Sequence, residues 1–316
     1  MSSIGGYLGW EFPKGEEYHD GLLRLNTGRN AFEHILRTRK YSRVFFPYYC
    51  CDALLEPVKK LGIEHAFYNI NDQLDPIIDF DIKDTDCFLY VNYFGVKNDT
   101  ITRLSKEVRN LVADNSQSFF SRAVANIDTF YSCRKFFGVP DGAYVSTADT
   151  SKNDYPIDTS YDSCRHLLKC ADTGIETGFA DFRENEHRLS GLEIRQMSVL
   201  TRAMMAAAPY AQSCQLRNDN FQYLHSRLAE INELKLNFSS INGPLNYPLL
   251  VSNPELRKQL IGEKIYIAEF WAAVRSWAPK ESYAYFLSEN LLALPVDQRY
   301  DKKDMDRIVE CILKFI

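Results

Sequence analysis

The 316-residue sequence lacks the features that mark several classes of protein. It has no dense run of lysine and arginine, and its formal net charge is −5, so nucleic acid is not an expected partner. Its apolar runs fall short of the roughly 18 residues that a membrane-spanning helix needs, so no membrane association is expected. The first residues, MSSIGGYLGWEF, have neither a basic region nor a continuous apolar stretch, which predicts no signal peptide.

Disulfide and metal-binding patterns are also missing. The eight cysteines include no CxxC pair, and the six histidines have no spacing typical of zinc ligands. Most cysteines stand in apolar runs, which indicates reduced thiols in a cytoplasmic protein rather than a disulfide framework. A metal site could arise only from residues far apart in the sequence. No internal repeat and no low-complexity segment is present.

Helical and strand-like segments alternate over the first half of the chain. Helices are expected at 29–40, 51–62 and 100–110, where apolar residues recur at helical spacing. Strands are expected at 43–47, 64–70, 86–95, 111–114, 126–132 and 142–147. This alternation predicts an α/β fold, a three-layer sandwich with a mostly parallel sheet.

The pattern changes from about Glu184, where a long helical stretch begins that Pro209 is expected to interrupt. Strands are then expected at 245–251 and 264–270, and helices from about residue 254 and over 302–315. We therefore predict a large domain over residues 1–205 and a smaller α+β C-terminal domain over residues 206–316.

Lys135 has an unusual setting in the stretch DTFYSCRKFFGVPDGAYVST, residues 128–147. It lies between two strand-like runs, just before a turn rich in glycine and proline, and Ser132 precedes it by three positions. A lysine in such apolar surroundings either extends its ammonium group to water or supplies a desolvated amine for chemistry. A surface lysine beside a turn is the alternative interpretation.

Two further segments suggest a ligand. In LNTGRNAF, residues 25–32, a glycine turn opens a helix whose free N–H groups can bind phosphate, although such a glycine often only makes a turn. In VADNSQSF, residues 112–119, Asp114 ends a buried strand, where α/β folds place ligands; a helix N-cap is the alternative. Together with Lys135 these segments call for a phosphate, a ring nitrogen that needs an anion, and an aldehyde. Pyridoxal 5′-phosphate (PLP) has all three.

With these segments the sequence resembles the DegT/DnrJ/EryC1/StrS aminotransferases, a branch of the fold-type I PLP enzymes that acts largely on nucleotide sugars. LNTGRNAF is similar to the phosphate-binding turn of that family, and VFFPYYCCDAL with LGIEHAFYNIN resembles its next segment. YVNYFGV, VADNSQSF and FYSCRKFFGVPDGAYV follow in the order of the family. LLALPVDQRYDKKDMDRIVECI resembles its closing segment, so the resemblance runs over most of the chain.

The resemblance implies a role for each matching residue. Lys135 would form the Schiff base with the cofactor and move the proton between substrate and cofactor. Asp114 would pair with the pyridine nitrogen, Gln117 would contact the ring on its hydroxyl side, and Tyr49 would stack on the ring. The phosphate would bind at Gly28, at Arg29 through its backbone amide, and at the hydroxyl of Ser132.

The sequence also departs from the family pattern. Phe130 stands where the family has a serine, Asn92 where it has a histidine, and Cys51 where it has the stacking aromatic residue. The turn after the lysine reads GVPDGA instead of Gly-Glu-Gly-Gly, and the chain is shorter than typical members. These departures weaken the expectation of a sugar substrate more than the expectation of the cofactor.

The leading hypothesis is therefore a PLP-dependent aminotransferase, a cytoplasmic homodimer that aminates a nucleotide-linked keto sugar with Glu or Gln as donor. A PLP-dependent lyase or dehydratase of the same fold is one alternative. A non-catalytic descendant that serves as an interaction subunit is another, although Asp114, Gln117 and Lys135 argue against it, since a scaffold has no need of a desolvated amine opposite a carboxylate. A Rossmann dehydrogenase is disfavoured because no G-x-G-x-x-G follows the first strand.

Overall fold

The computed structural model describes residues 4–148, 154–238 and 240–316. The first three residues of the N-terminal stretch, on which the prediction of no signal peptide partly rests, lie outside this part. Within the described residues no helix is long and apolar enough to cross a membrane, and no three metal-ligating side chains come together.

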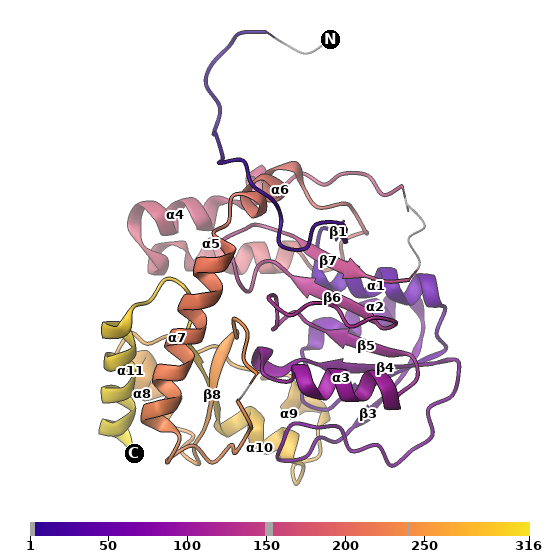
Figure 1. Cartoon of the computed structure of the whole chain (residues 1–316), viewed down its shortest axis with the longest axis vertical. Coiled ribbons are helices and arrows are strands. Elements are labelled where there is room, and N and C mark those ends of the chain that lie inside the picture. Colours follow the sequence, from indigo (N-terminus) through magenta and orange to yellow (C-terminus); the bar gives the residue numbers. More distant parts are fainter. Residues whose placement is uncertain (1–3, 149–153, 239) are drawn as a thin grey trace.

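A seven-stranded sheet forms the centre of the larger part of the molecule (Figure 1). Its strands are β1 (Leu23–Leu25), β2 (Arg43–Pro47), β3 (Glu64–Tyr68), β4 (Asp86–Val91), β5 (Leu111–Asp114), β6 (Asp128–Ser132) and β7 (Ala143–Ser146). They lie in the order β1-β7-β6-β5-β4-β2-β3, and β7 is antiparallel to both of its neighbours while β2 to β6 are parallel. The mostly parallel sheet predicted from the sequence is confirmed.

Helices cover both faces of this sheet. The helix α3 (Asn98–Glu107) lies on one face, and α1 (Gly28–Arg39) and α2 (Leu55–Leu61) lie on the other (Figure 1). Such a sheet must be apolar on both sides, and all six residues of β4 are indeed buried. The three-layer α/β sandwich is therefore confirmed.

The helix α1 begins and ends where its sequence directs. Thr27 is the N-cap, and its hydroxyl oxygen accepts a hydrogen bond from the amide of Asn30. Ala31, Phe32 and Ile35 face the sheet and are fully buried. This cap fixes the open N-terminal end of α1 beside the carboxyl ends of the parallel strands.

The remaining elements are mainly helical. They are α4 (Arg165–Thr173), α5 (Ile175–Arg188), α6 (Val199–Ala206), α7 (Tyr210–Leu228), α8 (Leu256–Gly262), α9 (Val274–Trp277), α10 (Tyr283–Asn290) and α11 (Lys302–Phe315). Short 3₁₀ helices span Asp52–Leu54, Tyr93–Gly95 and Tyr161–Ser163. A two-stranded antiparallel sheet pairs β8 (Asn246–Leu250) with β9 (Leu291–Pro295). This smaller α+β part agrees with the predicted fold class, while the division at residues 205 and 206 stays a prediction.

One predicted strand is wrong. Residues 264–270 form no strand, and only Ala268 makes an isolated bridge to Ala293 of β9. The strand β9, which the sequence did not predict, pairs with β8. Pro209 does interrupt the helical stretch, where it caps α7, and the eight cysteines are free thiols.

Candidate active site

The predicted site residues meet at the carboxyl ends of β5 and β6. Asp114 is the last residue of β5, and it lies opposite Phe130 of β6. Ser132 is the last residue of β6, and Lys135 follows in the next turn. In open α/β sheets this edge is where ligands bind.

Asp114 closes a turn rather than a helix. Its Oδ1 accepts a hydrogen bond of 2.8 Å from the amide of Ser116, and no helix begins between β5 and β6 in this fully described stretch. Its side chain is buried, and this burial raises the pKa of the Asp114 carboxyl, while the nearby ammonium group of Lys135 acts in the opposite direction. The helix-cap alternative therefore gives way to a buried carboxylate close to an amine.

Lys135 projects toward this carboxylate from a tight turn. The amides of Phe136 and Phe137 both donate to the carbonyl of Cys133, at 3.1 and 3.0 Å, which bends the chain around Lys135. The amine of Lys135 donates to the hydroxyl of Ser116 at 3.1 Å. A half-buried amine is thus held beside the turn that Asp114 closes.

Gln117 has an unused donor. Its Oε1 accepts a hydrogen bond of 2.6 Å from the amide of Phe94, which fixes the orientation of the side-chain amide. Its Nε2 is buried and has no hydrogen-bond partner in the described residues. A buried amide donor without a partner is costly, so an acceptor is expected there.

Gly28 and Ser132 form one corner of the site. A Cβ atom added to Gly28 would lie 4.0 Å from Cβ of Ser132, so the serine lies against the first residue of α1. The first amides of a helix have no partner within the helix and attract anions. The guanidinium of Arg29 pairs with Glu56 at 3.1 Å, which leaves its backbone amide as the group available at the helix start.

The predicted phosphate role of Ser132 can be tested with Ser132→Ala. We expect the dissociation constant for PLP to rise about tenfold, because the serine hydroxyl would no longer supply a hydrogen bond to the charged phosphate. Equilibrium titration followed by absorbance measures this change. Ser146→Ala is the matched control. Ser146 ends the antiparallel strand β7 and lies opposite Thr129, three residues before Ser132 along β6, so it is directed to the other edge of the sheet. Equal affinities of the two variants would argue against a phosphate site at Ser132.

Tyr49 lies in an aromatic cluster. Its ring stacks on Tyr93 with a centroid distance of 5.7 Å and meets Trp271 edge-on at 5.0 Å. Cys51, two positions further on, lies near Lys135. Burial raises the pKa of the Cys51 thiol, and the positive charge of Lys135 acts in the opposite direction. The structure thus brings Cys51 to the lysine, and stacking by Tyr49 stays a prediction.

Ser116 is a site residue that the sequence did not single out. It supplies both the amide that binds Asp114 and the hydroxyl that binds Lys135. The sequence feature that could have identified Ser116 is its position between Asp114 and Gln117. Asn92, where the family has a histidine, holds the neighbouring loops together, since its Nδ2 donates to Asn98 at 2.8 Å and Asn115 at 3.0 Å.

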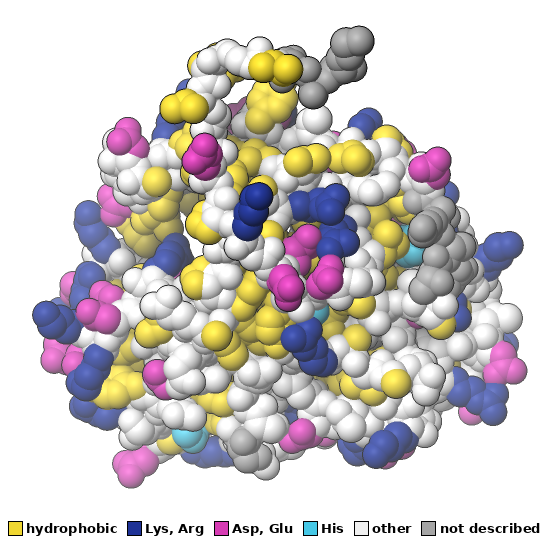
Figure 2. Space-filling view, turned by 45° about the horizontal axis from the view of Figure 1, so that its top comes forward, with side chains coloured by type: hydrophobic (Ala, Val, Ile, Leu, Met, Phe, Trp, Pro, Cys, Tyr) yellow, Lys and Arg dark blue, Asp and Glu magenta, His cyan; other side chains and the backbone are white. Residues whose placement is uncertain are grey.

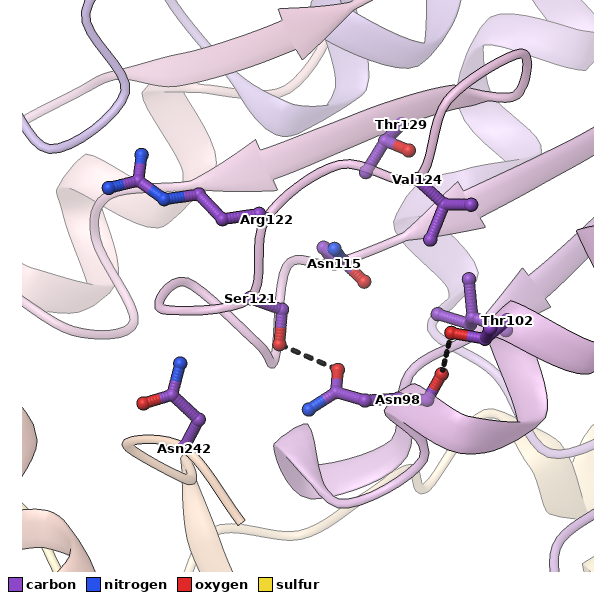
Figure 3. A pocket seen from close by; sticks show the side chains of 9 residues that line it. Asn98, Thr102, Asn115, Ser121, Arg122, Val124, Thr129 and Asn242 are labelled. Carbon is purple, nitrogen blue, oxygen red and sulfur yellow. Dashed lines mark hydrogen bonds between the residues drawn. The ribbon is translucent and has the colours of Figure 1, made fainter. Parts of the chain in front are cut away.

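A separate cavity is lined mainly by residues of α3, of the loop after β5 and of β6 (Figure 3). It has a volume of about 190 Å³, and its lining includes Asn98, Asn115, Ser121, Arg122 and Thr129. None of the predicted site residues lines it. Because successive residues of an extended chain point to opposite sides, Asn115 faces this cavity while its neighbour faces away from it. We therefore do not assign the cavity to the cofactor.

The residues around Lys135 fit PLP. Asp114 offers a buried carboxylate for the ring nitrogen, and the unpaired Nε2 of Gln117 offers a donor for the ring oxygen. Lys135 offers the amine, and Gly28 with Ser132 offers a helix start and a hydroxyl for the phosphate. The carboxylate, the amide donor, the amine and the helix start lie at one edge of the sheet. They match in turn the ring nitrogen, the ring oxygen, the aldehyde and the phosphate of PLP.

Solved structures share this fold, although no family model and no curated protein matches the sequence. The sugar aminotransferase CalS13 from Micromonospora echinospora is similar with a TM-score of 0.67, at 15% identity over 93% of this chain and 87% of that one. A DegT DnrJ EryC1 StrS aminotransferase from Brucella abortus is similar with a TM-score of 0.61, at 16% identity over 93% of this chain and 85% of that one.

Spr1654, a proposed sugar aminotransferase from Streptococcus pneumoniae, is similar in its PLP form with a TM-score of 0.62, at 15% identity over 92% of this chain and 85% of that one. These likenesses establish the fold. The chain has the fold of the fold-type I aminotransferases, with the mixed seven-stranded sheet and the small antiparallel sheet.

Proposed function

We propose that this protein is a PLP-dependent aminotransferase. The observation that carries the proposal is the position of a buried carboxylate, Asp114, near the amine of Lys135 at the carboxyl edge of a fold-type I sheet. Burial of a carboxylate without an ion pair is unfavourable. A ligand that presents a cation to Asp114 would offset that cost.

Each residue has a defined task in this proposal. PLP, when bound, supplies an electron sink. Asp114 would hold a proton on the ring nitrogen by Coulomb attraction, which the burial of its carboxylate strengthens. Lys135 would supply the amine that bonds to the aldehyde carbon with loss of water and, once the amine of the substrate has displaced it, the base that moves a proton between substrate and cofactor. The hydroxyl of Ser116 orients that amine.

The purified protein tests this proposal directly. Mixed with PLP it is expected to develop a visible near-violet absorption band, and excess glutamate is expected to discharge that band as the amino group is transferred. Formation of the band tests the cofactor, and its loss with glutamate tests transamination. A band that no amino acid discharges would favour the alternative of a PLP-dependent lyase or dehydratase, and absence of any band would favour a non-catalytic interaction subunit.

We propose a nucleotide-linked keto sugar as the acceptor and Glu or Gln as the donor. The similarity to the sugar aminotransferase CalS13 supports this choice. A transaminase for keto acids needs an arginine free to bind a second carboxylate. The two candidates in the smaller part, Arg257 and Arg275, share the carboxylate of Glu269, at 3.5 and 2.7 Å, so each already has a carboxylate partner.

Acceptor specificity gives a further prediction. The protein is first converted to its amino form with glutamate, and candidate acceptors are then added one at a time. We expect the visible band to return at least about a hundredfold faster with a nucleotide-linked keto sugar than with 2-oxo acids other than 2-oxoglutarate, because one misplaced or unpaired polar contact already costs 1–3 kcal/mol. Return with such 2-oxo acids alone would refute the sugar acceptor and leave the cofactor unaffected.

We further propose that the protein acts as a cytoplasmic homodimer. Hydrophobic side chains are exposed along the N-terminal segment and over the helices beside it (Figure 2). Ile4, Tyr7 and Leu8 are more than nine-tenths exposed, and Phe179 of α5 is 60% exposed. Apolar surface of this extent supports burial against a second copy. Light scattering on the purified protein measures the mass.

A further inference from the structure

Arg217 of α7 is a buried charge without a direct ion pair among the described residues. It is 1% exposed, and the Asp297 carboxylate, which pairs directly with Arg299 at 2.7 Å, acts on it only from a greater distance. Its Nη1 donates to the carbonyls of Pro244 at 3.0 Å and Leu245 at 3.3 Å, and its Nε donates to Oε1 of Gln298 at 2.8 Å. Burial lowers the pKa of the guanidinium to about 10, so the group still carries its charge at neutral pH. Burying a charge costs free energy, so the presence of the guanidinium here suggests that its hydrogen bonds have a role.

The side chains of Arg217 and Gln298 both donate to the carbonyl of Phe136, the residue after Lys135. This carbonyl accepts a hydrogen bond of 2.8 Å from Nε2 of Gln298 and a longer one of 3.4 Å from Nη2 of Arg217. The guanidinium carbon also lies 4.5 Å from the centroid of the Phe136 ring. Because Arg217 holds Oε1 of Gln298, the side-chain amide must present Nε2 to Phe136. The guanidinium thus orients the donor that fixes the turn around Lys135.

The segment at Pro244 and Leu245, in the smaller part of the molecule, also contacts the side of the site where Gln117 lies. The amide of Leu245 donates to the carbonyl of Phe94 at 2.8 Å, and the amide of Phe94 donates to Oε1 of Gln117 at 2.6 Å. A continuous chain of hydrogen bonds therefore runs from Gln117 through the segment at Leu245 to Arg217, and from there to the residue beside Lys135.

We propose that Arg217 and Gln298 are positioning residues for Lys135: they fix the carbonyl of Phe136 and so hold the lysine amine at its place beside Ser116 and Asp114. The inference deepens the proposed function, on which the role of Lys135 as the reacting amine rests. A purely structural role, in which the two residues only stabilise the junction between α7 and the segment after β9, is the competing account.

Two variants of Gln298 separate positioning from stability. Gln298→Met and Gln298→Glu both remove the donor to the carbonyl of Phe136. Methionine also removes the acceptor of the Arg217 guanidinium, so it lowers the melting temperature. Glutamate keeps that acceptor and places a negative charge against the buried cation, although the nearby Asp297 carboxylate limits the gain, so the melting temperature stays closer to the wild-type value than that of the methionine variant. Gln212→Glu is the matched control, since Gln212 is exposed on the same helix as Arg217.

The first measurement is trace acetylation of the protein without PLP, followed by peptide mapping, with the exposed Lys280 as internal reference. We expect the labelling rate of Lys135 relative to Lys280 to rise at least about threefold in both Gln298 variants and to stay unchanged in Gln212→Glu, because a looser turn releases the amine from Ser116. A rise confined to the destabilised methionine variant, or no rise in either variant, would overturn the positioning role.

The second measurement is the rate of Schiff base formation with added PLP. A positioning role predicts that this rate falls about tenfold in both Gln298 variants, since a displaced amine meets the aldehyde less often in the reactive geometry. An unchanged rate in Gln298→Glu would also overturn the inference. If the wild-type protein forms no Schiff base, the proposed function fails, while the acetylation result still decides whether these residues hold the lysine.

Discussion

Lys135→Ala is expected to lower the rate of transamination by about four orders of magnitude or more. The substitution removes the amine that bonds to the cofactor and the base that moves the substrate proton, and the amine of Lys97, in the described part of the chain, is already held by Asp75. The fold should be retained, because the half-buried side chain makes a single hydrogen bond, to the hydroxyl of Ser116, whose loss costs about 0.5–1.5 kcal/mol. Single-turnover reaction with glutamate, followed by absorbance, measures the effect.

Borohydride trapping provides the control for this prediction. Reduction of the wild-type protein with PLP should place the pyridoxyl group on Lys135, as peptide mapping would reveal, and Lys280→Ala should behave like the wild type. Lys97 is a weak competitor because its amine is already paired with Asp75 at 2.8 Å and with the carbonyl of Gln73 at 2.7 Å. A label on Lys97, or a normal rate in Lys135→Ala, would rule out the assignment.

The sheet could be predicted from the sequence because its strands carry local signals. Fully buried strands such as β4 read as continuous apolar runs, and helical periodicity marks α1 and α11 between or after them. The failure at residues 264–270 has a physical reason. Ile265 and Ile267 are buried and Tyr266 is exposed, so the alternation typical of a strand is real. Burial on one side does not by itself supply a ladder of hydrogen bonds, however, and the segment meets β9 at the isolated bridge from Ala268 to Ala293 alone.

The candidate site divides in the same way between local and long-range information. Asp114 and Ser132 could be located because each ends a strand, and strand ends in a parallel sheet meet at one edge. The contact between Arg217 and Phe136 joins residues 81 positions apart, and no local pattern marks it. The position of Tyr49 depends on Trp271 of the distant small part, so its register in a segment with several aromatic residues could not be settled from the sequence.

Asp114 also links function to stability without the cofactor. Burial raises the pKa of its carboxyl in the folded chain above the value in the unfolded chain, so the folded state binds this proton more tightly. The contribution of this group to stability therefore rises as the pH falls through the raised folded value, and the charged form costs stability at neutral pH. A neutral isostere should remove that cost, and PLP should remove it too by presenting its ring nitrogen as a cation.

Asp114→Asn is accordingly expected to have opposite effects on stability and on catalysis. The asparagine Oδ1 can still accept from the amide of Ser116, so the turn is kept. Without PLP the melting temperature at neutral pH should rise by about 1–3 °C, and its dependence on pH should weaken. With PLP the rate of transamination should fall at least about 10²–10³-fold, because the anion that keeps the ring nitrogen protonated is gone. Calorimetry and the single-turnover reaction measure the two effects on one preparation. A stabilised variant with a near-normal rate would mean that Asp114 only closes the turn, whereas a destabilised variant with a low rate would mean that its loss acts through the fold.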